Sequence, residues 1–348
     1  MATTSDPSVE LITISPNNAN DSLLNTSDEF RFDDYRQRVV VGSVYCLVAV
    51  TGFVGNVLVI LAVILSKKLQ TRTNAFVVNL ATADLVTCTA APFTALALLS
   101  EDGWPLPDAV CSVAAAVYFS CLSCSVMNLT AISINRLIVI TKPSSLYRSI
   151  YTTKNIGAML VFTWLYPIIV CCLPLFGLGR WGYSIKYKTC SLDSSCETSK
   201  LFSLVGSLLI YPVPLVILFV CYFKIYRHLK GHTKKMIAGV ELSDSSVSSS
   251  TRTQSRSFSK RQVEITKNLF VVMCAFIVCL APFAVAIMIP PSDPVIPWTG
   301  AFIIFNSAVN PVIYGVKHPH FKEVFSHMLR CRYRLIQEPS GCLQKFRH

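Results

Sequence analysis

The stretch "CSVAAAVYFSCLSCSVMNLTAISINRLIVI" occupies residues 111–140 and carries a single charged side chain, that of Arg136. A helix needs about 20 consecutive apolar residues to cross the hydrocarbon core of a bilayer, and this stretch is long enough to do so. The composition of the chain agrees, because 52% of its residues are hydrophobic and 14% are charged, whereas soluble domains carry about 25% charged residues. The sequence therefore predicts a membrane protein.

Similar apolar windows recur along the chain on both sides of this stretch. The predicted spans are residues 39–65, 75–99, 109–140, 155–178, 202–229, 263–289 and 296–316. They predict an all-α membrane protein that folds as a seven-transmembrane helix bundle over 39–316. Beyond the bundle, apolar side chains at helical spacing predict a short amphipathic helix over 317–330. An outer tail at 1–38 and a cytoplasmic tail at 331–348 complete the predicted organisation.

Lys and Arg are distributed unevenly among the connections. With the N-terminus outside, 24 of the 31 basic residues fall in the cytoplasmic connections, and 13 of the 19 acidic residues fall outside. This positive-inside pattern predicts a multi-pass protein with an extracellular N-terminus. It also accounts for the net charge of +12 without a nucleic-acid partner. Asn20 and Asn25 begin sequons in the outer tail and are the expected glycosylation sites.

Three cysteines lie on the predicted outer side. Cys111 opens the third span and Cys190 precedes the fifth, so a disulfide between them would hold the intervening loop over the bundle. Cys196 is then left over, either as a free thiol or as a competitor for Cys111. On the inner side, Cys331 is a candidate for palmitoylation, with a free thiol as the alternative.

Asp84 is the only carboxylate near the middle of a predicted span, and an ionisable group there is a functional candidate because it is costly to insert. Asn56, Ser125, Asn306 and Asn310 are polar groups near the middle of other spans. Together these residues would hold a cation or water and repack between two states. For any one of them an interhelical hydrogen bond is the simpler alternative. The histidines lack zinc-site spacing and no catalytic motif is present, so neither a zinc site nor an enzyme is expected.

Several short motifs are spread over the whole bundle. They are "GNVLV" at 55–59, "NLATADL" at 79–85, Cys111, "NRL" at 135–137, Trp164, Pro214, Tyr222, "CLAP" at 279–282 and "NPVIYGVKHPHF" at 310–321. This set, which covers residues 39–330, resembles the rhodopsin-like (class A) G-protein-coupled receptors. The resemblance implies a plasma-membrane receptor in which an extracellular ligand favours an outward swing of the sixth span. The swing opens a cleft for a heterotrimeric G protein. Arrestin and a receptor kinase are further implied partners, and the Ser- and Thr-rich segment 241–261 is expected to be a flexible loop.

The resemblance also implies roles for individual residues. The implied switch and G-protein-coupling residues are Asn135, Arg136, Tyr222, Gln262, Leu280, Pro282, Asn310, Pro311 and Tyr314. The implied sodium pocket consists of Asp84, Ser125, Asn306 and Asn310. An allosteric sodium ion is therefore the one bound ion or cofactor that the resemblance implies.

Three departures from the family pattern affect this switch. Asn135 stands where the family usually has an aspartate that restrains the arginine, and Gln262 replaces a second acidic restraint. We therefore predict elevated basal activity, because a neutral amide cannot offer Arg136 a charge-assisted hydrogen bond. The alternative is that Arg136 only extends to the membrane interface. Leu280 replaces the usual tryptophan switch, which leaves open a receptor-like scaffold or decoy that does not activate G protein.

The same comparison restricts the ligand. Tyr118 replaces the aspartate of aminergic receptors and Ile304 replaces the lysine that binds retinal in opsins, so neither an amine held by that aspartate nor retinal is expected. The predicted ligand pocket comprises Tyr118, Phe119, Leu122, Arg180, Gly206, Ile210, Phe283, Ile287, Gly300 and Ile304. With Lys186 and Lys188 above this apolar lining, a lipid or fatty-acid-like ligand is favoured over a peptide. Pairing of these cations with acids of the N-terminal tail or with Glu101 and Asp102 is the alternative. A weaker resemblance to moody-type and medium-chain fatty-acid receptors points to the same ligand class.

Overall fold

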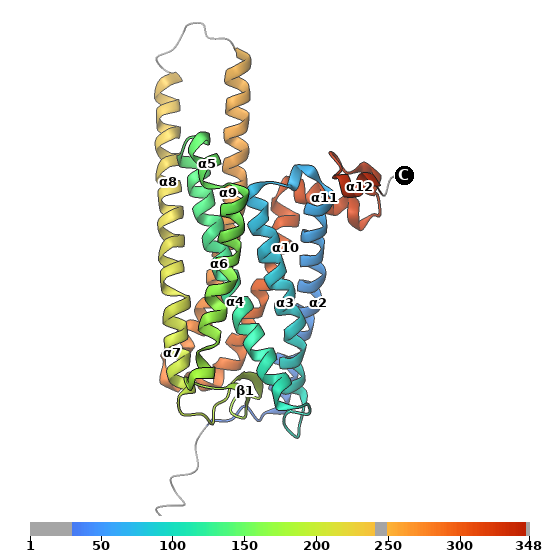
Figure 1. The fold of residues 1–348 in the computed structure, drawn as a ribbon, viewed down its shortest axis with the longest axis vertical. Coiled ribbons are helices and arrows are strands. Elements are labelled where there is room, and N and C mark those ends of the chain that lie inside the picture. The colour runs from blue at the N-terminus through green and yellow to red at the C-terminus, as the bar shows by residue number, and fades with distance from the viewer. Residues whose placement is uncertain (1–29, 241–248, 346–348) are drawn as a thin grey trace, which may run out of the picture.

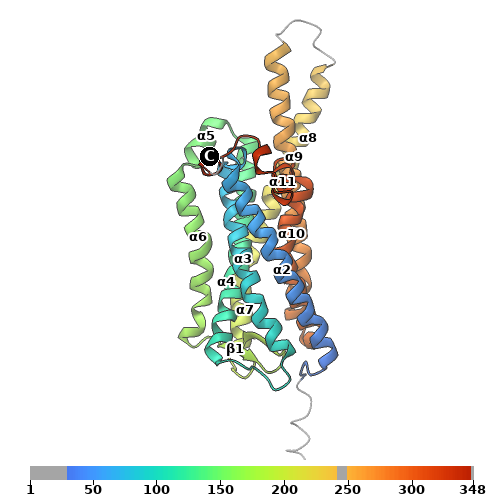
Figure 2. The same cartoon turned by 90° about the vertical axis from the view of Figure 1, so that its right-hand side faces the viewer.

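The computed structural model of the protein describes residues 30–240 and 249–345, and it is mainly helical over them. Within those ranges, seven helical segments are long and apolar enough to cross a membrane. They pack side by side in one bundle (Figures 1 and 2). The predicted all-α, seven-helix bundle is confirmed.

The spanning segments begin and end near the predicted windows. They are α2 (Tyr35–Leu65), α3 (Arg72–Leu99), α4 (Asp108–Thr141), α6 (Thr153–Cys171) with η2 (Leu173–Phe176), α7 (Ser199–Ile210) with α8 (Pro212–Val240), α9 (Ser249–Met288) and α10 (Ile296–Lys317). The shorter elements are η1 (Lys67–Leu69), α5 (Ser144–Ile150), β1 (Trp181–Ser184), β2 (Thr189–Leu192), η3 (Pro290–Val295), α11 (Pro319–Leu329), η4 (Tyr333–Leu335) and α12 (Gly341–Lys345). Polar side chains fix some helix starts: Asp34 accepts a hydrogen bond from the Arg36 N–H, and Thr71 accepts one from the Asn74 N–H.

Two spans differ from the sequence-based expectation. The fifth span is divided at Tyr211 into α7 and α8, because Pro212 and Pro214 have no N–H groups to continue the helical hydrogen bonds. The sixth helix, α9, begins at Ser249, so the prediction of a loop is wrong for residues 249–261, while 241–248 lie outside the described residues. Both α8 and α9 extend well beyond the other helices (Figure 1).

A two-stranded antiparallel hairpin, β1–β2, covers the end of the bundle at which α2 begins; we call this the hairpin end (Figure 1). Tyr183 lies opposite Cys190 in the hairpin. Cys190 forms a disulfide with Cys111 at the start of α4, so the predicted bridge is confirmed. The N-terminal segment is also attached here, because the Phe32 N–H donates to the Lys186 carbonyl oxygen over 2.8 Å.

The opposite end of the bundle carries α5, α11 and α12, and we call it the α11 end (Figure 2). Helix α11 occupies the segment predicted to be amphipathic. Its buried side chains are Phe321, Val324, Phe325 and Met328. Leu329, which was expected on the same face, is 69% exposed. The residues after α11 fold back onto the end of α2, where Ser66 and Pro339 form a β-bridge.

Helix α2 approaches its neighbours closely at two glycines of the bundle interior. A Cβ atom at Gly52 would lie 2.5 Å from the Cys88 sulfur, and one at Gly55 would lie 2.8 Å from the Pro311 Cβ. Larger side chains at these positions would therefore push α2 away from α3 and α10. The close approach brings Asn56 within 2.8 Å of the Ser307 carbonyl oxygen, to which its amide donates.

Candidate functional site

Asp84 lies at the centre of the bundle and is completely buried. Its carboxylate accepts three hydrogen bonds, from Ser125 Oγ at 2.9 Å, Ser307 Oγ at 3.1 Å and Asn310 Nδ2 at 2.8 Å. Helices α3, α4 and α10 are therefore joined at one acidic side chain. Ser125 and Asn310 were predicted for this cluster, whereas Ser307 was not, because a serine within a span has no distinguishing sequence signal.

The remaining amides of the cluster are less completely bonded. Asn306 is buried, but its Nδ2 has no hydrogen-bond partner among the described residues, and the Oδ1 atoms of Asn56 and Asn310 have none either. Unpaired buried polar atoms of this kind usually indicate an unseen water or ion. The oxygens of Asp84, Ser125 and Asn310 form the kind of donor set that a small hard cation prefers.

Arg136 is 5% exposed near the α11 end of α4. Tyr147 of α5, Tyr222 of α8 and Tyr314 of α10 lie close enough to interact with it electrostatically. The structure thus brings Arg136 together with both tyrosines predicted to line the coupling cleft. Tyr147 was missed, because its place in a short helix outside the spans gave no sequence signal. The ring of Tyr314 also stacks on the ring of Phe321 in α11, with the ring centroids 5.5 Å apart.

Asn135 is fully buried beside Arg136 and is held by two other elements. Thr73 Oγ1 in α3 donates to Asn135 Oδ1 over 2.7 Å, and Asn135 Nδ2 donates to the Tyr147 hydroxyl over 3.4 Å. The amide is therefore a junction between α3, α4 and α5. A carboxylate at this position would accept from both hydroxyl groups and add a negative charge next to Arg136.

The α9 side of the switch is only partly described. The side chain of Gln262 lies outside the described residues, and Glu264, two residues further on, is exposed. Leu280 is 6% exposed and packs in the main apolar core, near the kink-permitting Pro282. Closer to the α11 end, Asn268 Nδ2 donates to the Lys317 carbonyl oxygen over 2.8 Å and so ties α9 to α10.

The predicted ligand-pocket residues fall into separate groups at the hairpin end. Tyr118 and Ile304 belong to one apolar cluster, which also contains Phe32 of the N-terminal segment and Tyr45 of α2. Gly300 borders this cluster, because a Cβ atom there would lie 3.2 Å from the Tyr45 hydroxyl. Part of the predicted pocket is therefore packed by side chains from the first 45 residues.

A second group is aromatic and involves the hairpin. Phe119 lies next to Trp181 of β1 and Phe202 of α7, with ring centroids 5.3 and 5.8 Å away, and the latter two rings are 5.3 Å apart. Gly206 borders this cluster, because a Cβ atom there would be in van der Waals contact with the Phe202 ring, 3.5 Å away. Trp181 and Phe202 were not predicted. Aromatic content alone does not show which loop residue turns inward.

The other predicted pocket residues are dispersed. Leu122 and Phe283 pack against the main core, Ile210 is completely buried and Ile287 is half-buried. The side chain of Arg180 is 72% exposed and lies 3.9 Å from Asp193. The structure therefore does not bring Arg180 together with the apolar lining.

The basic residues of the hairpin turn are paired with acids. Lys186 Nζ lies 2.7 Å from Asp293 Oδ2 in η3, and the Tyr187 hydroxyl donates to Asp293 Oδ1 over 2.6 Å. Lys188 Nζ lies 3.0 Å from Asp33 Oδ1 in the N-terminal segment. The alternative considered from the sequence, pairing with acids of the N-terminal tail, is confirmed for Lys188, whereas Lys186 pairs with Asp293 rather than with Glu101 or Asp102. The hairpin is consequently fastened to the N-terminal segment before α2 and to η3 before α10.

The remaining predicted modification sites have varied positions. Asn20 and Asn25 lie outside the described residues. Cys196 is a half-buried free thiol beyond the hairpin, and a hydrogen bond with the Thr198 hydroxyl lowers its pKa below the usual value. Cys331 is an exposed free thiol just after α11.

Known proteins resemble this chain in sequence and fold. Residues 55–314 match the model of the seven-transmembrane receptor (rhodopsin) family. The octopamine receptor beta-2R of Chilo suppressalis is 30% identical over 322 residues, which cover 83% of this chain and 79% of that receptor. The alpha-1A adrenergic receptor of Oryzias latipes is 31% identical over 326 residues, covering 84% and 67% respectively. The structure of squid rhodopsin superposes with a TM-score of 0.74 at 23% identity, covering 89% of this chain and 90% of that one.

Proposed function

This chain belongs to the rhodopsin family of seven-transmembrane receptors, and from that premise we propose that it couples an extracellular, largely apolar ligand to activation of a heterotrimeric G protein. The family consists of G-protein-coupled receptors, not enzymes, so a ligand and a G protein are its partners. The observation that carries the proposal is the convergence of Arg136, Tyr222 and Tyr314 near the α11 end. The proposed location is the plasma membrane, with the hairpin end outside, which the excess of basic residues in the opposite connections supports.

Coupling follows from the position of these three residues between α4, α8 and α10. A ligand that binds more tightly when α9 is displaced at the α11 end shifts the population toward that state. In that state Arg136 and the two phenols face the opening and contact the G protein. Arrestin and a receptor kinase are proposed to use the same end of the bundle, and membrane lipids surround it.

Replacement of the arginine tests signalling directly. Arg136→Ala should abolish both basal and ligand-stimulated G-protein dissociation in cells, at surface expression equal to the wild type. Arg148→Ala in α5 is the matched control for loss of one inner arginine and should retain both responses. If the wild type shows neither basal nor stimulated activity, the chain is a scaffold or decoy. The replacement of the family's tryptophan by Leu280, which is buried in the core, specifically favours that second candidate.

The ligand is proposed to be lipid or fatty-acid-like, with an apolar body. Nine of the ten predicted lining residues carry no charge, and the aromatic cluster around Phe119 offers an apolar surface. The cations near the hairpin, Arg180, Lys186 and Lys188, are already paired with acids. The apolar body of the ligand is therefore the main determinant of binding. Position 118 is a tyrosine and therefore offers no carboxylate to hold an amine.

A ligand screen by G-protein dissociation distinguishes the candidate classes. Fatty acids and lysolipids should activate, whereas a peptide library should not. Octopamine belongs in the screen because one relative is an octopamine receptor, and no response to it is expected. Activation by octopamine or by a peptide, without any lipid response, would overturn the proposed ligand class.

A sodium ion at Asp84 is proposed as an allosteric regulator. The buried carboxylate, the hydroxyl oxygens and the unpaired amide oxygen of Asn310 fit such an ion. Asp84 and Ser125 would be its main holders, together with Asn310. A bound cation there stabilises the arrangement in which α3, α4 and α10 converge, and so opposes their repacking during activation.

A further inference from the structure

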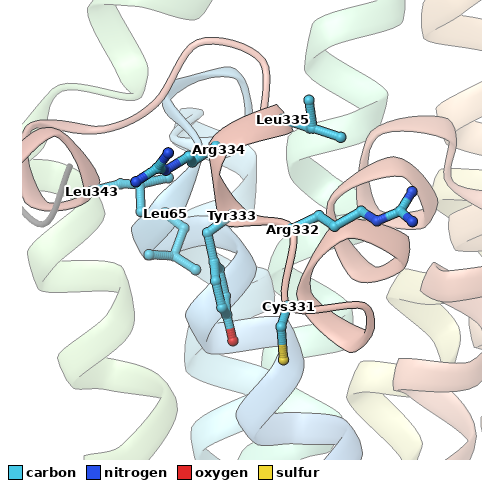
Figure 3. A pocket seen from close by; sticks show the side chains of 7 residues that line it. All are labelled: Leu65, Cys331, Arg332, Tyr333, Arg334, Leu335 and Leu343. Carbon is cyan, nitrogen blue, oxygen red and sulfur yellow. The ribbon is translucent and has the colours of Figure 1, made fainter.

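The α11 end of the bundle contains a cavity of about 580 Å³ that is separate from the coupling site. It is lined by Leu65, Cys331, Arg332, Tyr333, Arg334, Leu335 and Leu343. One wall is the last residue of α2, and the rest belongs to the segment that follows α11. Figure 3 shows Tyr333 and Cys331 projecting in the same direction beside Leu65, while Arg332 and Arg334 extend to opposite sides.

The segment that builds this cavity is firmly attached to α2 and η1. The Lys67 N–H donates to the Glu338 carbonyl oxygen and the Ser340 N–H donates to the Leu65 carbonyl oxygen, both over 2.9 Å. Ile336 is 2% exposed and therefore serves as an apolar anchor. The cavity wall is thus a defined part of the fold rather than a loose end of the chain.

The lining combines apolar side chains with cationic ones. Three leucines and a tyrosine ring provide apolar surface, and two exposed arginines provide positive charge. Of the described residues that line the cavity, none is acidic. Guanidinium groups bind phosphate through paired hydrogen bonds, and basic pockets at the cytoplasmic face of membrane proteins bind anionic headgroups.

The proposed orientation puts the cavity at the inner boundary of a bilayer. Leu65 ends the first membrane-crossing helix, and Leu335 is 56% exposed next to it. We propose that this cavity binds an inositol phospholipid of the inner leaflet, with its phosphates on Arg332 and Arg334 and an acyl chain along the leucines. A headgroup with several phosphates suits the site because the two guanidinium groups extend to opposite sides.

Lipid binding to the purified full-length receptor tests this proposal. The protein is treated with hydroxylamine, so that no thioester-linked acyl chain on Cys331 occupies the cavity. Native mass spectrometry then compares binding of a bisphosphorylated phosphatidylinositol and of phosphatidylcholine. The double variant Arg332→Gln/Arg334→Gln should lose about tenfold in affinity for the inositol lipid, since two charge-assisted contacts disappear. Arg330→Gln, which removes an exposed arginine outside the lining, is the matched control and should bind normally.

Two further arms test the lipid part of the proposal. Leu335→Ser should weaken binding of the intact lipid, because it removes apolar wall while leaving both arginines in place. The soluble inositol phosphate with the same phosphates should compete poorly. Equal loss of binding in Arg330→Gln, or full displacement by the soluble headgroup, would overturn the proposal. These measurements need no G-protein signal, so their outcome is independent of the proposed function.

Discussion

Asn135 is the residue at which this receptor departs most directly from its family's switch. Its amide joins Thr73 and Tyr147, and the change Asn135→Asp would keep both contacts while adding a charge beside Arg136. A charge-assisted hydrogen bond exceeds a neutral one by about 1 kcal/mol, which shifts a two-state population about fivefold. Asn135→Asp should therefore lower basal G-protein activation severalfold at equal surface expression.

The matched control for this change is Thr73→Val. It removes the 2.7 Å hydrogen bond to Asn135 without adding a charge, so basal activation should not fall. An unchanged or raised basal level in Asn135→Asp would show that the missing carboxylate does not set the resting equilibrium.

Asp84 gives a second prediction for a single residue. If sodium binds at this carboxylate, basal activation in membranes should fall when sodium replaces a large organic cation at equal ionic strength. Asp84→Asn should abolish that sodium response, whereas Asn79→Ala should largely preserve it, because the Asn79 amide donates to Asn128 and Thr163 rather than to Asp84. A full sodium response in Asp84→Asn would place the ion elsewhere.

Among the helices, α2 and α3 are fastened together at the hairpin end by a buried arginine. Arg38 Nε donates to the Leu98 carbonyl oxygen over 2.8 Å, and Arg38 Nη2 donates to the Ser100 carbonyl oxygen. A cation at these carbonyls also complements the C-terminal end of the α3 dipole. Arg38→Ala should lower the free energy of unfolding by about 1–3 kcal/mol, because two carbonyl groups lose their partner.

Thermal unfolding of the purified receptor measures this effect. Arg36→Ala removes an exposed arginine of the same turn and should leave the unfolding temperature nearly unchanged. Equal unfolding temperatures for the two variants would mean that water replaces the Arg38 contacts without loss.

The elements also show which features the sequence could predict. The spans follow from hydrophobic length alone, and Pro212 and Pro214 account for the division of the fifth span. The hairpin could not be predicted, since its strands have four residues each and its register depends on the bridge to α4. Likewise, Thr73 lies 62 residues from Asn135 and Tyr147 lies in a different helix 12 residues on, so their contacts depend on how three helices pack.

For the whole molecule, the orientation in the membrane is testable through Cys196. Its lowered pKa means that more reactive thiolate is present at neutral pH than for an ordinary cysteine, and the labelling rate should rise with pH up to that pKa. A membrane-impermeant maleimide applied to intact cells should therefore label the receptor, and Cys196→Ser should remove most of this label. Labelling of Cys331 instead would show that the topology is the reverse of the proposed one.

The acid partners of the hairpin have a consequence for how quickly a ligand arrives. Each of Arg180, Lys186 and Lys188 faces a carboxylate within 4 Å, so the charges largely cancel at distances beyond the Debye length of about 8–10 Å. A cancelled field cannot steer an anionic ligand toward the receptor by diffusion. The outer connections also carry more acidic than basic residues, so the association rate constant of an anionic activating ligand should not fall as the ionic strength rises. The hairpin end therefore selects a ligand by shape and solubility rather than by long-range attraction.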